Sequence, residues 1–107
     1  MSLNVYLQKL RVTSVFRANY THNVGGMAEA AGIYKHVWRP EELGITKASE
    51  LIEPLRGAIA LMKSDPPRFI SLNPTNGWGS YDTFLPWLEG YLEACEEHPD
   101  ATVRASR

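Results

Sequence analysis

The sequence predicts an α+β domain, with three main helices and a small two- to three-stranded sheet formed by the N-terminal and C-terminal strands. Apolar and polar residues alternate at both ends of the chain, which is the period of a half-buried strand. Between these ends, three segments carry apolar residues at the spacing of one helix face, and proline or glycine separates them.

The N-terminal strand is expected over residues 3–12, followed by a second extended segment over residues 14–20. The phase of the alternation changes between residues 9 and 14, which predicts a bulge or a turn. A short last strand is expected over residues 101–106, and the first strand is its obvious partner. The residues that share one face within these strands are Leu3, Val5 and Leu7, then Phe16, Ala18 and Tyr20, and finally Ala101, Val103 and Ala105.

The first helix is expected from Asn23 to about Trp38, because its apolar residues recur at helical spacing throughout. Pro40 ends this helix, since the residue before a proline avoids helical dihedral angles. The second helix is expected to begin near Thr46 or Ser49, which are both suitable N-caps, and to end at the sequence "SDPP".

Pro54 lies inside the apolar stripe of the second helix. We expect either a kink there or a short turn at residues 47–52 followed by a separate helix. The third helix follows the sequence "NGWG", with Ser80 as its N-cap, and Pro99 closes the segment. Pro86 lies near the start of this helix and is expected to bend it.

The length of 107 residues fits one domain, residues 1–107. The formal net charge of -1, with 11 basic and 12 acidic residues in no long run, argues against nonspecific nucleic-acid binding, which needs a basic face. We expect no membrane span and no signal peptide. The single Cys95 excludes an internal disulfide and favours a reducing compartment, the cytoplasm. A thin sheet has open edges, and these favour a homodimer.

The first candidate binding segment is "NYTHNVGG", where a strand meets a helix. Its polar residues, Asn19, Thr21, His22 and Asn23, offer hydrogen-bond donors and acceptors beside a helix N-terminus that favours anions. Two glycines follow and would let a ligand approach the backbone. The structural alternative is that Asn23 or Thr21 only caps the helix, while His22 bonds a neighbouring backbone group.

The second candidate segment is "NPTNGWGSY", which contains Asn76, Trp78 and Ser80. Asn76-Gly77 is a strong turn signal, and Ser80 begins a helix whose N-terminus is another potential anion site. Trp78 lies between two glycines, so it either inserts into the core from the loop or presents its face to a base, a sugar or a partner chain.

Arg39 is the third candidate, because a guanidinium just past a helix end can bind a phosphate as a bidentate fork. The alternative is a structural role in capping the helix or pairing with a carboxylate. Cys95 and His98 have the spacing of a metal pair, but two further ligands are missing, so we expect no metal and no cofactor. No nucleophile elbow, P-loop or dinucleotide fingerprint is present in the sequence, and we assign no catalytic residue.

Three stretches of the sequence resemble a group of small, uncharacterised phage and bacterial proteins of about this length. The stretches are "NYTHNVGGMAEAAGIYKHVWRPEELGI", "NPTNGWGSYDTF" and "YLEACEEHPDATVRASR", and the THN, WRPEE and NGWG blocks are distinctive together. The resemblance spans nearly the whole chain and implies a single intracellular domain. It implies no activity and supplies no catalytic residues.

The leading hypothesis is non-enzymatic binding of a small polar or anionic, nucleotide-like ligand, as in a phage protein that sequesters a host signalling nucleotide. Trp78 would stack on a base, asparagines would read its edges, and Arg39 or helix N–H groups would bind a phosphate. One alternative is a protein-interaction module anchored by Trp78 and Trp87. Another is a small hydrolase in which His22 acts as general base with Asp82 or Glu29. We further expect His22 or Asn23 to line the same pocket as Trp78.

Overall fold

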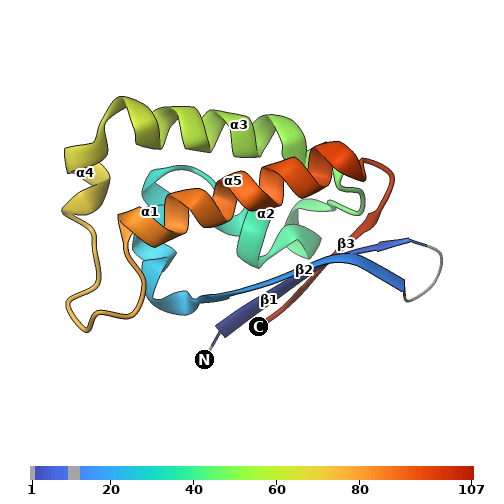
Figure 1. The fold of residues 1–107 in the computed structure, drawn as a ribbon, viewed down its shortest axis with the longest axis horizontal. Helices are drawn as coiled ribbons and strands as arrows, with labels where there is room; N and C mark the ends of the chain where they lie inside the picture. Colours follow the sequence, from blue (N-terminus) through green and yellow to red (C-terminus); the bar gives the residue numbers. More distant parts are fainter. Residues whose placement is uncertain (1, 10–12) are drawn as a thin grey trace.

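The computed structural model describes residues 2–9 and 13–107 (Figure 1). Three antiparallel strands form one sheet: β1 (Ser2–Lys9), β2 (Thr13–Thr21) and β3 (Thr102–Ser106), in the order β2-β1-β3. The C-terminal strand therefore pairs with the first strand, as predicted, and the α+β class is confirmed. The predicted strand residues 10–12 lie outside the described residues.

The pairing of β1 with β2 shifts by one residue along the sheet. Leu7 lies opposite Phe16, and Gln8 lies opposite Ser14, so β2 contains one extra residue at this point. This is a β-bulge, and it lies beside the region where the alternation of the sequence changes phase. The three apolar residues of β1 that were expected to face the core are fully buried.

The prediction of one continuous helix from Asn23 to Trp38 is wrong. This segment forms a 3-10 turn η1 (His22–Val24), a short helix α1 (Gly25–Ala30) and a second short helix α2 (Tyr34–Trp38). Gly32 interrupts the helix with a φ of 73°. Its N–H bonds the carbonyl of Glu29 while the N–H of Ile33 bonds that of Ala28, which is the Schellman pattern of a helix C-terminus. Both short helices have buried apolar residues, Met27 and Ala28 in α1 and Val37 and Trp38 in α2, so the apolar pattern of the sequence continues across the break.

After a 3-10 turn η2 (Pro40–Leu43), the chain forms α3 (Ser49–Ser64). Pro54 lies inside this continuous helix, so the alternative of a turn followed by a separate helix is wrong. Neither predicted N-cap holds that position, which belongs to Ala48. The N–H of Thr46 instead bonds the carboxylate of Glu50 at 2.9 Å.

The sequence "SDPP" ends α3 as predicted, but it also begins a short helix that was not predicted, α4 (Pro66–Ile70). Proline is accepted at the first position of a helix, because the N–H that it lacks would have no partner there. The last helix is α5 (Tyr81–Glu97), with Ser80 at the N-cap position and Pro86 within the first turns.

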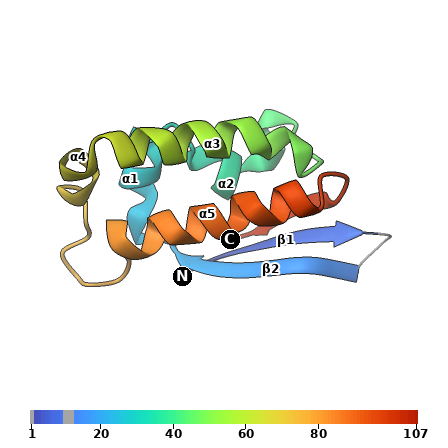
Figure 2. The same cartoon turned by 45° about the horizontal axis from the view of Figure 1, so that its top comes forward.

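All the helices lie on one side of the sheet, and α3 runs alongside α5 (Figures 1 and 2). The core lies between these helices and the inner face of the sheet. Its largest fully buried side chains include Trp38, Tyr91, Phe69, Phe84, Leu3, Leu7 and Met27. Within the described residues, no helix is long and apolar enough to cross a membrane.

Candidate functional site

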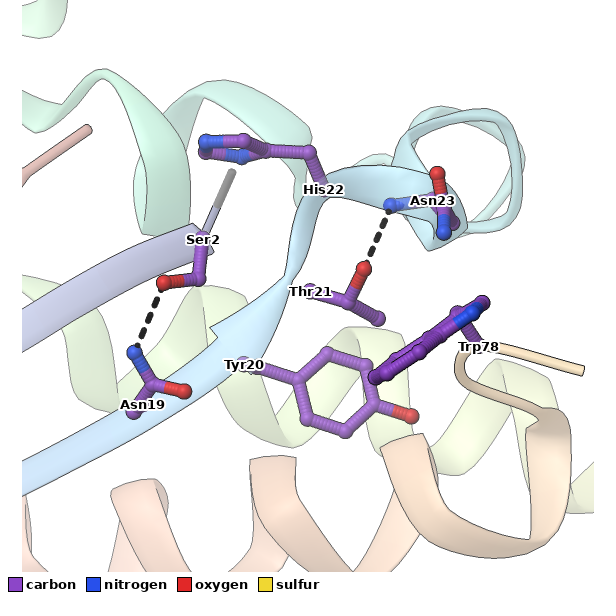
Figure 3. Close-up of a pocket in the computed structure, with 7 residues that line it drawn as sticks. All are labelled: Ser2, Asn19, Tyr20, Thr21, His22, Asn23 and Trp78. Atoms are coloured by element: carbon purple, nitrogen blue, oxygen red, sulfur yellow. Dashed lines mark hydrogen bonds between the residues drawn. The ribbon is translucent and has the colours of Figure 1, made fainter.

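The end of β2 turns into η1 through a local cap. The side-chain hydroxyl of Thr21 accepts a hydrogen bond from the N–H of Asn23 at 3.3 Å. Thr21 is therefore the N-cap of this turn, and the capping interpretation is correct for this residue. The turn that it starts is too short to carry the dipole of a long helix. The side chain of Asn23 is exposed beside the cap (Figure 3).

His22 is held by a contact with the core rather than by a backbone group. The indole N–H of Trp38 donates a hydrogen bond to Nδ1 of His22 at 2.8 Å. An imidazole nitrogen that accepts such a bond carries no proton, so in the neutral ring the proton is on Nε2. His22 therefore offers an N–H donor, and not a lone pair, to a ligand beside it.

The loop with the sequence "NGWG" lies directly against this segment. Gly79 has a φ of 90°, and a β-carbon there would come within 2.7 Å of Cγ2 of Thr21 and 3.0 Å of Cγ1 of Val24. Only glycine permits both this dihedral angle and this approach. The side chain of Asn76 accepts the N–H of Trp78 at 3.0 Å and thereby closes the turn before the tryptophan.

Trp78 is 69% exposed, so the alternative of a tryptophan inserted into the core is wrong. The residue that packs closely on the end of β2 is the neighbouring Gly79 and not the tryptophan. The ring instead stands at the surface next to Thr21 and Tyr20 (Figure 3). A flat aromatic face in this position is available for stacking.

These segments enclose an open cleft of about 740 Å³, lined by Ser2, Asn19, Tyr20, Thr21, His22, Asn23 and Trp78. The prediction that His22 or Asn23 shares a pocket with Trp78 is therefore confirmed. His22 and Trp78 lie at opposite sides of the cleft, with the threonine between them (Figure 3). Binding of a ligand by these residues stays a prediction.

Asn19 is organised by the sheet. Its amide nitrogen donates to the hydroxyl of Ser2 and to the side-chain oxygen of Asn4, both at 3.0 Å. These bonds orient the amide within the cleft wall, and its oxygen is left as an acceptor. Ser2 and Tyr20 also line the cleft and were not predicted as site residues, because Ser2 precedes the predicted strand and Tyr20 is an apolar-face residue of the second one.

Ser80 lies outside the cleft, and the start of α5 is already occupied by side chains of the protein. The N–H of Ser80 donates to the Tyr20 hydroxyl at 3.3 Å, and the N–H of Tyr81 donates to the side-chain oxygen of Asn73 at 2.8 Å. The Tyr20 hydroxyl also bonds the hydroxyl of Thr83. The prediction of an anion site at this N-terminus is therefore not supported, because two of its donors already have partners.

Arg39 does not line the Trp78 cleft. It lines a neighbouring cleft of about 430 Å³, whose other walls include His22, Tyr34 and Arg107. His22 borders both clefts. Arg39 pairs with Glu42 at 3.1 Å, and Arg107 bonds the carboxylate of Glu41 at 3.0 Å and the carbonyl oxygen of Trp38 at 2.8 Å.

The described contacts give little support to catalysis. The lone pair that a His22 general base would need is bound to the Trp38 N–H, and no described hydrogen bond joins the ring to a carboxylate or hydroxyl. Cys95 is buried, and this burial raises the pKa of its thiol to about 12. In the parts of the chain that the structure describes, no three His, Cys, Asp or Glu side chains are placed to hold a metal ion.

Trp87, the second predicted interaction anchor, is partly buried among the rings of Tyr20, Phe84 and Tyr91. Its indole N–H donates to the carbonyl oxygen of Asn19 at 3.1 Å. Trp87 thus supports the strand that carries the cleft residues, and its role as an interaction anchor stays a prediction.

No protein-family model, curated protein or solved structure matches this chain. The fold and the cleft define a small α+β protein whose polar surface cleft forms where β2 meets the loop before α5. The resemblance based on the THN, WRPEE and NGWG blocks stays a prediction.

Proposed function

We propose that this protein binds a small polar or anionic, nucleotide-like ligand in the Trp78 cleft without transforming it. The observation that carries the proposal is that His22 lines both clefts. One cleft offers an exposed aromatic face, and the other offers Arg39 and Arg107. A nucleoside phosphate has the same two parts, a flat base and an anionic group.

In this arrangement the base stacks on Trp78, and the Asn19 and Asn23 side chains bond its polar edges. The Nε2–H of His22 donates to the ligand at the boundary between the clefts. The phosphate of the ligand replaces the Glu42 carboxylate as the ion-pair partner of Arg39. This exchange has a small cost, because an exposed ion pair contributes only about 0–1 kcal/mol, whereas a bidentate guanidinium–phosphate contact is among the stronger hydrogen-bonded pairs.

The test is isothermal titration calorimetry against a panel of nucleotides and cyclic nucleotides. Binding that weakens by roughly 5- to 150-fold in Trp78→Ala, the range given by the loss of one stacked base, supports the proposal. Leu72→Ala removes another exposed apolar side chain and is the matched control. Absence of heat for every compound, or equal affinity in both variants, overturns it.

A second candidate is a protein-interaction surface, and the exposure of Trp78 favours it. Ile70 and Leu72, which precede the same loop, are 45% and 41% exposed. Exposed tryptophans are enriched among the residues that dominate binding energy at interfaces. Pull-down from a lysate with the wild-type chain and with Trp78→Ala tests this candidate, which requires a partner captured only by the wild type.

We also propose a homodimer and a cytoplasmic location. β2 is one edge of the sheet and is the place where a second copy can add a strand, whereas β3 already pairs at Thr102 with Lys47 and donates the Val103 N–H to the Thr46 carbonyl oxygen at 2.9 Å. Light scattering on a size-exclusion column measures the mass, and a monomer at all concentrations rejects the dimer. The cytoplasmic proposal rests on the single, buried Cys95.

A further inference from the structure

The sheet has one face packed against the helices and a second face that none of the described helices covers (Figure 2). Alternation along β1 places Leu3, Val5 and Leu7 on the covered face, and it places Tyr6 on the other. In the register of the sheet, Tyr6 lies between Arg17 of β2 and Arg104 of β3. The neighbouring row of the same face is formed by Asn19, Asn4 and Ser106.

This face carries positive charge without compensation. The three strands contain no Asp or Glu, so all 12 acidic residues of the chain lie in helices and connections. Among the described residues, neither Arg17 nor Arg104 forms an ion pair, whereas Arg39, Arg56 and Arg107 each do. The sheet is therefore positively charged although the formal net charge of the whole chain is -1.

The centre of the face is an aromatic platform. The guanidinium of Arg17 lies over the ring of Tyr6, with its carbon 5.5 Å from the ring centroid. A small hollow of about 170 Å³ surrounds this pair and extends to Asn4 and Asn19. Asn19 also lines the Trp78 cleft, so the hollow and the cleft are adjacent along β2.

We propose that this open sheet face, centred on Tyr6 between Arg17 and Arg104, binds a short stretch of single-stranded nucleic acid. Sites of this kind combine positive charge that follows the phosphates with flat groups on which bases stack, and both aromatic rings and guanidinium planes serve as such groups. The Tyr6–Arg17 pair supplies the stacking surface, Arg104 contacts a phosphate on the other side, and the asparagines supply polar contacts to the bases.

The charge on the face argues for this occupant over a second copy of the chain. Two copies that met through this face would bring arginines together with no carboxylate from either sheet between them. An acidic peptide would match the charge but would not use the flat ring. The proposal does not require Trp78, because Tyr6, Arg17 and Arg104 all belong to the sheet, although Asn19 lines both the hollow and the Trp78 cleft.

The test measures fluorescence anisotropy of labelled single-stranded DNA and RNA oligonucleotides with the purified chain. Arg17→Glu and Arg104→Glu are compared with Arg68→Glu, an exposed charge reversal on α4 that changes the net charge equally. Tyr6→Leu keeps an apolar side chain in the strand but removes the ring. Circular dichroism checks that each variant is folded.

We expect the three sheet variants to weaken binding by about tenfold or more, and Arg68→Glu to leave it nearly unchanged. One phosphate contact on a single strand contributes about -0.7 to the slope of log K against log salt, so Arg104→Glu should reduce the magnitude of this slope by about 0.7.

Several results would overturn the proposal. One is the absence of binding by the wild type. Another is a loss of nucleic-acid binding in Arg68→Glu as large as the loss in the sheet variants, which would mean that binding depends only on the net charge of the protein. The face would be assigned to an acidic peptide if polyglutamate, at the same concentration of charge, displaced the oligonucleotide and if Tyr6→Leu did not change the affinity. Loss of binding in Trp78→Ala but not in the sheet variants assigns the nucleic acid to the cleft. A change of oligomeric mass in the sheet variants assigns the face to a second copy.

Discussion

Gly79 lies so close to Thr21 that a β-carbon at position 79 would come within 2.7 Å of the Thr21 methyl carbon. This contact joins the loop before α5 to the end of β2 and sets the separation of the two walls of the cleft. We predict that Gly79→Ala destabilises the protein by roughly 2–5 kcal/mol, the sum of left-handed backbone strain and overpacking. Urea unfolding measures the change.

Gly77→Ala is the matched control for this prediction. Gly77 also has a positive φ, 77°, but a β-carbon there meets nothing within 4 Å. The control should therefore lose only the strain, about 1–2 kcal/mol. Equal losses in the two variants would mean that the contact with Thr21 contributes nothing.

The Tyr20 hydroxyl fastens the start of α5 to β2. It accepts the N–H of Ser80, so Tyr20→Phe leaves a backbone donor of the N-cap without its partner. We expect a loss of about 1 kcal/mol in the free energy of unfolding. Tyr6→Phe removes a hydroxyl that has no described hydrogen bond, and its midpoint in urea should match the wild type. A Tyr20→Phe protein as stable as Tyr6→Phe would contradict this role.

The hydrogen bond from Trp38 to His22 should be visible in the tautomer of the imidazole. With the indole N–H on Nδ1, nitrogen NMR of the neutral wild-type ring should show the proton on Nε2. Trp38→Phe removes the donor and should give a mixture of tautomers. Trp87→Phe removes an indole N–H that bonds Asn19 instead, so it should leave the His22 signals unchanged. A wild-type ring protonated on Nδ1 would reject the assignment.

Cys95 should make the protein less stable in alkali. Burial, with a smaller contribution from the Glu96 charge, raises the pKa of its thiol from 9.0 to about 12. Between these values the unfolded thiol loses its proton while the folded thiol keeps it, so the free energy of unfolding falls as pH rises through this window. Urea midpoints measured from pH 8 to about 12 should decline less steeply in Cys95→Ala than in the wild type.

Tyr91 contributes to the same decline, because burial raises the pKa of its hydroxyl in the same direction. Because the charge on Cys95 also raises the pKa of Tyr91, the difference in slope between the two proteins reports the thiol together with its effect on this hydroxyl. Parallel slopes in the wild type and Cys95→Ala would show that the thiol does not titrate differently in the folded and unfolded chains.

The sequence alone was sufficient to predict the strands and to predict which face of each strand is buried. Alternation placed Leu3, Val5 and Leu7 inside, and the same pattern identified the last strand and its partner. A strand and its buried face can be predicted locally, because successive side chains point to opposite faces and the resulting alternation is visible in a few consecutive residues. Gly32 shows the limit of periodicity: the helical pattern continued across a C-cap, although "AGI" carried the signal of a Schellman end.

The candidate site was only partly determined by the sequence. The polar residues of "NYTHN" and the turn at Asn76 could be found from residue type and spacing alone. The position of Trp78 at the surface, the partner of His22 and the exclusion of Ser80 from the cleft were decided by the tertiary structure. Each depends on a contact between residues far apart in the chain, such as Gly79 with Thr21 or Tyr20 with Ser80, which exists only once α5 packs on the sheet. Such contacts cannot be predicted from a local sequence pattern, because they depend on how the whole core packs.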